Sequence, residues 1–564
     1  MQVSAFRKWI SSVRDKFLSC KTLLKEAKND PPENPYKSKY EARDILSSIL
    51  CDLEKQWEKG DDIYISVIWS ILKYELGIIA LETEEYSTGC DHLEECWEIL
   101  KELSMKPEAS LLTLNVLNQL GILWSGRGEP SKALTFLLEA EKIYNNYKSN
   151  CAICPCESDD MFKDEIVYPE DWGPFEKTFT LTLYYLAQVY EHLNESEKSA
   201  KYCHMTLKRQ KEYNVYDEKE WSINCATLSQ YYIQEKMFIT ARHLLACATY
   251  ILAKYESSID NKVENEDVWD DIHRSKAEVA WCWLKYCINL LVECQNLPEI
   301  NFNESLDPDY KLSDEETVCE IEDQVPYFVS RFEAARKVFI FGQNQIKEVK
   351  LYYTLSDHAN NYVQLIRDHS KLYKSLLMYE VDLSRQCKMH KRRIDMLEDV
   401  LSKLNPQYYL AVCRQLKFEL GETYYELIDL KLKTINISPQ NNVLPFVKKI
   451  NSLIIRAIEH FKAFIDSLKD HEGLMPEIFE DDLVRPALIA HSYLGGLYLK
   501  LIESDTIKKL QNLTKSEENY KFILKYTEKN PSQAHFVEKE LPVVKEMIEL
   551  MPEKIIQVRG STMF

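Results

Sequence analysis

The chain has 564 residues, of which 45% are hydrophobic, and a formal net charge of −20 at pH 7. It has only 13 glycines and 19 prolines, too few for the many tight turns of a β-rich or Rossmann-type protein. The acidic balance disfavours nucleic acid or an anionic membrane as the main partner, because binding there gains free energy when Lys and Arg neutralise phosphates. Composition therefore indicates long helices and a basic partner.

Nothing in the sequence indicates secretion. The sixteen cysteines are scattered without a compact framework, and the first residues, MQVSAFRKWISSVRDKF, are amphipathic without an apolar signal core. No run approaches 18 apolar residues, so we expect no transmembrane helix. We expect a reduced, cytoplasmic protein.

The first half of the chain reads as a series of helices. Helices are expected at 4–28 and 37–58, separated by the helix-breaking run NDPPENPYKSK. Four helical hairpins follow, with cores near 64–103, 110–147, 176–211 and 219–254. The segment 149–175 is an insert rich in Pro, Asp and Cys, and a further helix is expected at 271–294.

Small residues recur at one spacing in the four hairpins. In the first, Gly77 is followed by Gly89, Leu93 and Cys96, which are 12, 16 and 19 residues further on. The other sets are Gly121, Ala133, Leu137 and Ala140; Ala187, Ser199, Cys203 and Thr206; and Ser229, Ala241, Leu245 and Ala248. At these positions the two antiparallel helices of a tetratricopeptide unit approach most closely. The spacing predicts an all-α, tetratricopeptide-like α-solenoid, with long and irregular hairpins because its sets do not follow the regular repeat of about 34 residues.

An acidic segment divides the chain. Between residues 299 and 323 there are ten acidic residues and one basic residue, Lys311. Such a composition cannot bury enough apolar surface to order itself without help. We expect an N-terminal tetratricopeptide-like half at 1–295, an acidic linker at 296–325 and a C-terminal helical half at 326–564. The second half includes one long helix expected from Asp357 to Arg385.

Two local motifs have a chemical and a structural interpretation. Cys151, Cys154 and Cys156 form C-x2-C-x-C, which could begin a zinc site if a fourth ligand came from elsewhere. No second CxxC or paired His follows at zinc-finger spacing, so we expect no metal.

The basic cluster 387–393 could serve nuclear import or bind an acidic ligand. A solvated helix face, or an intramolecular dock for the acidic linker, is the favoured interpretation.

Catalytic signatures are missing from the sequence. It contains no Gly-rich phosphate loop, HExxH, GxSxG or kinase signature. We expect neither an enzyme nor a cofactor or small-molecule substrate.

The first helix of a tetratricopeptide hairpin lines the concave groove, where a ligand is expected. Tyr185 and Thr227 fall two residues before Ala187 and Ser229 respectively, and Gln188 follows Ala187, so all three could face the groove. The alternative for Tyr185 is core packing with its hydroxyl satisfied.

Several long strings resemble one family. They are PYKSKY (35–40), NQLGILWS (118–125), LYYLAQVYEHL (183–193), KYCHMTLKRQ (201–210), CATLSQYYI (225–233), CKMHKRRIDMLE (387–398), NPQYYL (405–410) and NYKFILKYTEKNP (519–531). In this order they resemble the kinesin-binding protein family. The resemblance implies a right-handed α-solenoid that clasps the motor domains of a subset of kinesins, covers their microtubule-binding helix and prevents attachment to the microtubule.

The family's groove residues transfer onto matching strings. They fall on Tyr185, Gln188, Gln210 and Thr227, three of which the hairpin register also selects. The resemblance further implies a cytoplasmic, cytoskeleton-associated protein. A generic tetratricopeptide scaffold or co-chaperone adaptor is the alternative, and a zinc-dependent protein using the Cys151 loop is a remote third.

Overall fold

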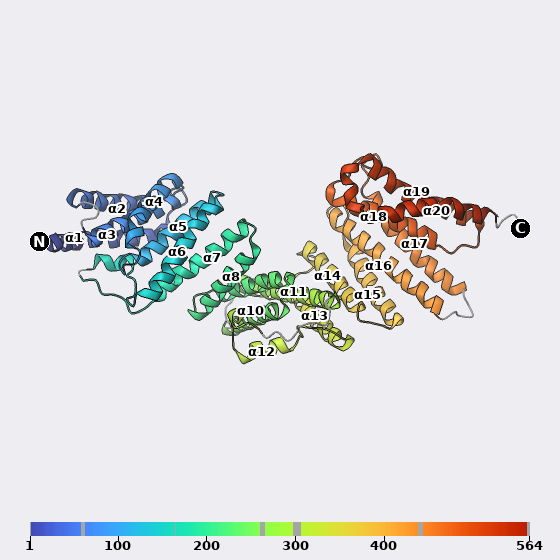
Figure 1. Cartoon of the computed structure of the whole chain (residues 1–564), viewed down its shortest axis with the longest axis horizontal. Coiled ribbons are helices and arrows are strands. Elements are labelled where there is room, and N and C mark those ends of the chain that lie inside the picture. Colours follow the sequence, from blue (N-terminus) through green and yellow to red (C-terminus); the bar gives the residue numbers. More distant parts are fainter. Residues whose placement is uncertain are drawn as a thin grey trace. The chain divides into compact units, whose positions relative to one another are not determined.

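The computed structural model describes residues 2–57, 62–163, 165–259, 266–296, 306–437 and 444–560, and every regular element within these ranges is a helix (Figure 1). The all-α, tetratricopeptide-like solenoid expected from the sequence is confirmed. Close packing divides the chain into two compact units. Unit 1 is Met1–Tyr231 with Asp307–Ser313, and unit 2 is Tyr232–Leu306 with Asp314–Phe564.

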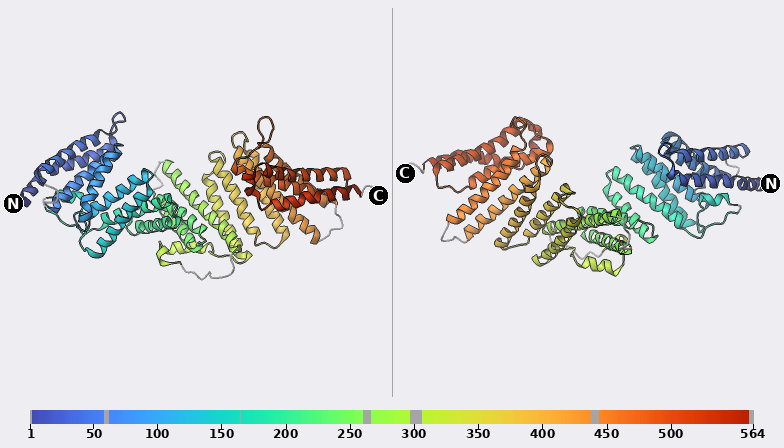
Figure 2. Two further views of the ribbon diagram at one scale, coloured as in Figure 1. Left: turned by 45° about the horizontal axis from the view of Figure 1, so that its top comes forward. Right: turned by 180° about the vertical axis from the view of Figure 1, so that it is seen from behind.

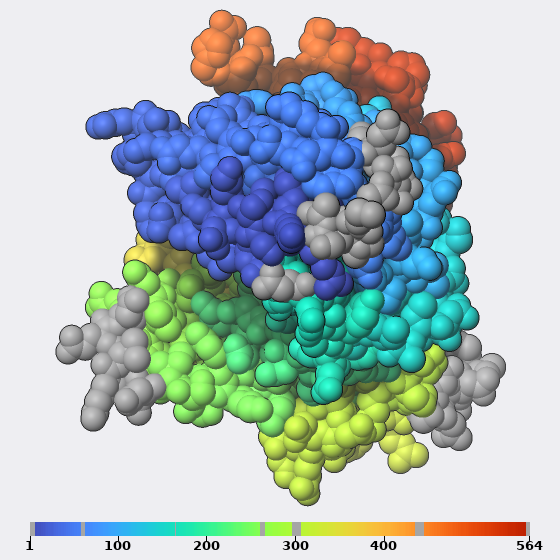
Figure 3. All heavy atoms as spheres, turned by 90° about the vertical axis from the view of Figure 1, so that its left-hand side faces the viewer, coloured from blue at the N-terminus to red at the C-terminus, as the bar shows by residue number. Residues whose placement is uncertain are grey.

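Unit 1 is a row of antiparallel helices in which each helix from α1 to α7 contacts the one that follows it. Its helices are α1 (Gln2–Glu26), α2 (Lys37–Gln56), α3 (Ile63–Glu82), α4 (Tyr86–Leu103), α5 (Ser110–Gly126), α6 (Pro130–Asn150), α7 (Gly173–His192), α8 (Ser196–Glu212) and the greater part of α9 (Glu218–Gln234). Figure 3 views the first of these helices from the N-terminal side, with their side chains in dark blue. The two expected N-terminal helices and the first three expected hairpins are therefore present.

The small residues lie where paired helices approach most closely. A Cβ atom added to Gly121 would lie 2.7 Å from Cγ of Leu137, and one added to Gly89 would lie 3.1 Å from the carbonyl oxygen of Gly77. Ala187 and Ser229, at the equivalent places in later helices, are buried. The predicted register is confirmed in the α3–α4 and α5–α6 hairpins, because no larger side chain fits at these crossings.

The inserted segment 149–175 is a packed part of unit 1. Its short 3₁₀ helix Ser158–Phe162 places the ring of Phe162 on that of Phe17, with centroids 3.9 Å apart. Arg14 Nε donates a hydrogen bond to the Phe162 carbonyl oxygen at 2.6 Å. Cys156 joins the apolar core formed by α1 to α5. Packing thus accounts for this cysteine without a ligand.

One helix differs from the expectation that no apolar run is long enough to cross a membrane. In the described part of the chain, Ile63–Glu82 is long and apolar enough by length and composition. Of its apolar window, 72% is buried inside the fold. We therefore interpret α3 as a core helix of unit 1.

Unit 2 continues with paired helices, seen from two further directions in Figure 2. They are α10 (Phe238–Ser258), α11 (Glu266–Asn296), α12 (Glu316–Asp323), α13 (Phe332–Tyr352), α14 (Ala359–Leu377), α15 (Leu383–Lys403), α16 (Leu410–Ile437), α17 (Leu444–Asp466), α18 (Asp481–Lys500), α19 (Thr506–Lys529) and α20 (Leu541–Gly560). The pairs α14–α15, α16–α17 and α18–α19 stack in order, and their apolar faces share one core.

The single helix expected from Asp357 to Arg385 is wrong, because the chain forms α14 and α15 with a break at 378–382. Side chains supply hydrogen bonds at this break. The Glu380 carboxylate accepts from the backbone N–H groups of Val381 and Asp382 at 3.1 and 3.0 Å. Asp382 then caps α15 by accepting from the Ser384 N–H at 2.7 Å. Such a cap stabilises a new helix start.

The acidic segment is ordered with help from other helices in the part that is described; residues 297–305 lie outside it. In unit 2, Val318 of α12 is fully buried and Glu322 lies 2.6 Å from His243 Nδ1 on α10. In unit 1, Lys208 Nζ donates to the Pro308 carbonyl oxygen at 3.4 Å. The expected halves and the linker at 296–325 stay a prediction. Close packing places the boundary between the two compact units within α9.

Candidate partner-binding surface

One face of α7 carries exposed side chains along its length. Leu181 is 50% exposed, Tyr184 is 41% exposed, and Gln188 is also exposed. Their spacing of three and four residues places them in a single stripe along the helix. This stripe lies on the first helix of the α7–α8 pair, where the groove was expected.

Tyr185 combines the two roles considered for it. It is half-buried, with its ring packed against the core shared by α5 to α8. Its ring centroid lies 5.4 Å from that of the exposed Tyr184. Burial raises the pKa of the Tyr185 hydroxyl. Part of this side chain therefore supports the fold, and part remains accessible beside the stripe.

The other two predicted residues lie on neighbouring helices. Thr227 is exposed on α9, one turn from the exposed Asn224. Gln210 is half-buried near the end of α8, where its carbonyl oxygen accepts from the Val215 N–H at 2.9 Å. The structure thus places Tyr185 beside the stripe that contains Gln188, whereas Gln210 lies on a second helix rather than a first.

Buried hydrogen bonds fix α7 against α5. Asn118 Nδ2 donates to the Thr178 carbonyl oxygen at 3.1 Å, and the Thr182 hydroxyl donates to Asn118 Oδ1 at 2.8 Å. Asn118 and Thr182 are both buried. Leaving a buried amide without a hydrogen-bond partner costs about 1–3 kcal/mol of stability. The hydrogen bonds of Asn118 therefore hold α7, and the stripe on it, in one orientation.

A buried ionic network joins the start of α7 to the end of α8. Glu176 is 1% exposed; it accepts a hydrogen bond from the Tyr144 hydroxyl at 2.5 Å and pairs with Arg209 and, at 2.8 Å, with Lys148. Burial acts to raise the pKa of Glu176, but hydrogen bonds from Lys148 and Tyr144 and the charge of Arg209 outweigh it, so the pKa is lowered. Arg209 directly precedes Gln210, so the network positions that residue.

Sequence reasoning did not find this network. Its members lie 28 to 33 residues from Glu176 along the chain, beyond any local periodicity. A Glu within the apolar run PFEKTFTLTL was the one signal for a buried carboxylate.

Two of the three cysteines in the motif are packed in the interior. Cys154 and Cys156 are buried, and burial raises the pKa of Cys156 to about 12. Within the described ranges, no group of three or more His, Cys, Asp or Glu side chains could hold a metal ion.

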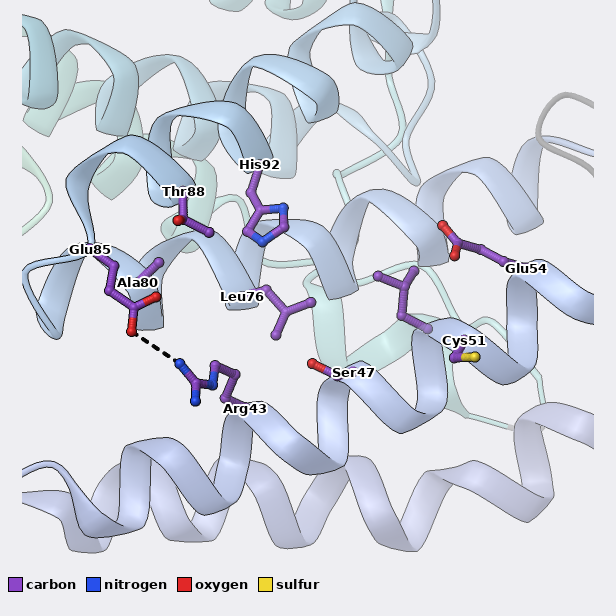
Figure 4. Close-up of a pocket in the computed structure, with 10 residues that line it drawn as sticks. Arg43, Ser47, Cys51, Glu54, Leu76, Ala80, Glu85, Thr88 and His92 are labelled. Carbon is purple, nitrogen blue, oxygen red and sulfur yellow. Dashed lines mark hydrogen bonds and ion pairs between the residues drawn. The ribbon is translucent and has the colours of Figure 1, made fainter.

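A small pocket of about 210 Å³ lies among α2, α3 and α4 (Figure 4). Arg43 and Glu85 form an ion pair of 3.0 Å at one side of it, and His92 and Cys51 also line it. Burial lowers the pKa of His92. The pocket is smaller than the roughly 300–1,000 Å³ typical of small-molecule sites, so we assign it no ligand.

Comparison with known proteins agrees over almost the whole chain. The family profile described as "KIF-1 binding protein C terminal" matches residues 219–558. The KIF-binding protein of Gallus gallus is 40% identical to the chain, with 97% of each protein covered. The KIF-binding protein of Homo sapiens is 35% identical, with 97% of this chain and 98% of that protein covered. The solved structure titled "Kinesin binding protein (KBP)" has a TM-score of 0.66 at 35% identity, with 96% of this chain and 98% of that one covered. The chain belongs to the KIF-binding protein family.

Proposed function

We propose that this chain binds kinesin motor domains through the first-helix strip of unit 1, defined as Tyr185 and Gln188 on α7 and Thr227 on α9. The names of its relatives support a kinesin partner. The observation that carries the choice of surface is that Gln188 is exposed and Tyr185 half-exposed on α7, a helix fixed by buried hydrogen bonds to α5. Thr227 is exposed on α9.

The chemistry of the strip suits recognition of another protein. Tyr185, Gln188 and Thr227 offer neutral donors and acceptors, and the exposed Leu181 and Tyr184 flank them with apolar area. Interface energy concentrates in such anchored aromatic residues. A motor that does not match the polar groups leaves some of them buried and unpaired, which gives selection among kinesins.

Charge favours inhibition of the motor. A kinesin meets the acidic microtubule through basic residues, and a protein with a net charge of −20 attracts the same basic face. Occupying that face blocks microtubule attachment without any chemistry by this chain. The protein accordingly acts in the cytoplasm, in association with the cytoskeleton, as a non-enzymatic regulator.

A motor-domain pulldown with strip variants tests the surface. Gln188→Ala and Thr227→Ala should each weaken capture of a susceptible motor. Combining them with Tyr185→Ala should reduce the binding free energy by about 1–3 kcal/mol. Matched controls are Asn145→Ala and Thr135→Ala, because both residues are exposed on α6, the second helix of its pair. Equal capture by strip and control variants would exclude this surface. Failure of every motor to bind would favour the generic scaffold or co-chaperone adaptor.

A further inference from the structure

Unit 2 contains a larger pocket of about 540 Å³ on its own first helices. Side chains of α14, α16 and α18, the first members of three successive pairs, form most of its lining. Its volume lies within the range of about 300–1,000 Å³ that accommodates a small ligand or an inserted side chain. All of its lining residues belong to unit 2.

The basic residues of this pocket already have partners. The contacts are Arg367 Nε to Glu419 at 3.0 Å, Lys374 to Glu426 at 2.7 Å, Arg393 to Glu426 at 2.7 Å, Lys371 to Asp368 at 3.1 Å, and Arg414 Nε to the Ser467 hydroxyl at 3.2 Å. Each of the first four is an ion pair within unit 2, and the fifth joins α16 to Ser467, directly after the end of α17. These basic side chains therefore stabilise the fold, and we do not assign the pocket an anionic ligand.

A carboxylate between two of these pairs has no cation of its own. Glu419, Glu422 and Glu426 lie three and four residues apart, on one face of α16. The outer two form the ion pairs given above. Within the described part of the chain, Glu422 has one hydrogen bond, from the Tyr493 hydroxyl at 3.2 Å, and no ion pair. Burial raises the pKa of Glu422, although Lys374 opposes this, as expected for a half-buried carboxylate without a close cation.

The rest of the lining complements a cation. Glu480 and Asp482, at the start of α18, are exposed and have no ion pair among the described residues. Phe418, half-exposed, and Phe464, buried, supply an aromatic wall. A planar guanidinium can pair with both oxygens of a carboxylate and stack on an aromatic face. A lysine ammonium is a point charge, which can pair with a carboxylate but lacks the flat surface for stacking.

We propose that this pocket receives an arginine side chain of a protein partner, with its guanidinium bound by Glu422 and drawn in by Glu480 and Asp482. The aliphatic part of the arginine packs on Phe418. This assignment does not depend on the strip of unit 1 or on the partner being a kinesin.

Fluorescence anisotropy with the full-length chain and three labelled probes tests the pocket. The probes are Gly-Arg-Gly-Arg-Gly and the same peptide with lysine or with citrulline, the neutral analogue of arginine. The arginine probe should bind tightest and the citrulline probe weakest. Glu422→Gln should weaken binding of the arginine probe by about tenfold or more, since a hydrogen bond to a charged group contributes about 1.5–3 kcal/mol.

Two controls separate this site from general attraction to an acidic protein. Glu518→Gln makes the same change of charge at an exposed position of α19 and should leave binding unchanged. The glutamine of Glu422→Gln can still accept the Tyr493 hydrogen bond, so its melting temperature should match that of the wild type. The proposal is overturned if the wild type does not bind the arginine probe, if citrulline binds equally well, or if Glu518→Gln weakens binding as much as Glu422→Gln.

Discussion

Replacing Gly121 by alanine tests the helix crossing on which the fold of unit 1 depends. The added Cβ would lie 2.7 Å from both Cγ and Cδ2 of Leu137, whereas carbon atoms pack best at about 3.5–4.0 Å. Leu137 is fully buried and cannot move into solvent. The buried Leu137 side chain must therefore repack, or α5 and α6 must separate, at a cost of about 1–3 kcal/mol.

A second glycine of the same helix supplies the control. A Cβ on Gly126 would meet no atom within 4 Å, so Gly126→Ala adds helix propensity without a clash. Both substitutions gain up to about 1 kcal/mol of propensity, less at the helix end. The clash should therefore leave Gly121→Ala about 1–3 kcal/mol less stable than Gly126→Ala.

Native-state hydrogen exchange of the α5 and α6 amides measures this difference locally, without requiring a reversible melt of the whole chain. Amides protected by the crossing should exchange about 5- to 150-fold faster in Gly121→Ala than in Gly126→Ala. Equal protection in the two variants would show that α5 and α6 do not approach closely at this position.

Two further predictions concern buried groups of unit 1. Glu176→Gln leaves Arg209 without its carboxylate and should cost about 3–5 kcal/mol at neutral pH. The folded-state pKa of Glu176 is lowered, so the ionised side chain stabilises the fold above its unfolded-state pKa, and this stabilisation is lost as pH falls through the folded-state pKa. Circular dichroism melts across the acidic range should show this loss of stability in the wild type and not in the variant. Cys156, with its pKa raised to about 12, should be alkylated by iodoacetamide far more slowly than the exposed Cys51, as measured by peptide mass spectrometry. Comparable rates would contradict the packing of the 149–175 insert.

Local patterns predicted the fold of unit 1 well. The helix crossings depend on small residues at fixed separations, so the spacing from Gly77 or Gly121 carries the geometry directly. The same register placed Gln188 and Thr227 on exposed helix faces. Tyr185 could not be settled this way, because its ring lies at the margin between the core and the surface.

Long-range pairing explains most of what the sequence did not predict. In the basic cluster 387–393, the favoured interpretation was a solvated face or a dock for the acidic linker. Lys388, Lys391 and Arg392 are exposed, whereas His390 and Arg393 are buried and Arg393 pairs with Glu426, 33 residues away. The break before α15 has no Pro or Gly and depends on side-chain hydrogen bonds from Glu380 and Asp382. The acidic segment was expected to need help in ordering, but nothing local identified His243 as its contact.

Co-sedimentation of a susceptible kinesin motor domain with microtubules, with and without this chain, tests the proposed function most directly. The account predicts that increasing amounts of the chain move the motor from the pellet into the supernatant, where the two form a complex. The strip variant Gln188→Ala combined with Thr227→Ala should release less motor at the same concentration. If motor, microtubule and this chain instead sediment together with the motor still attached, competition for the microtubule-binding face is wrong and the chain acts as an adaptor.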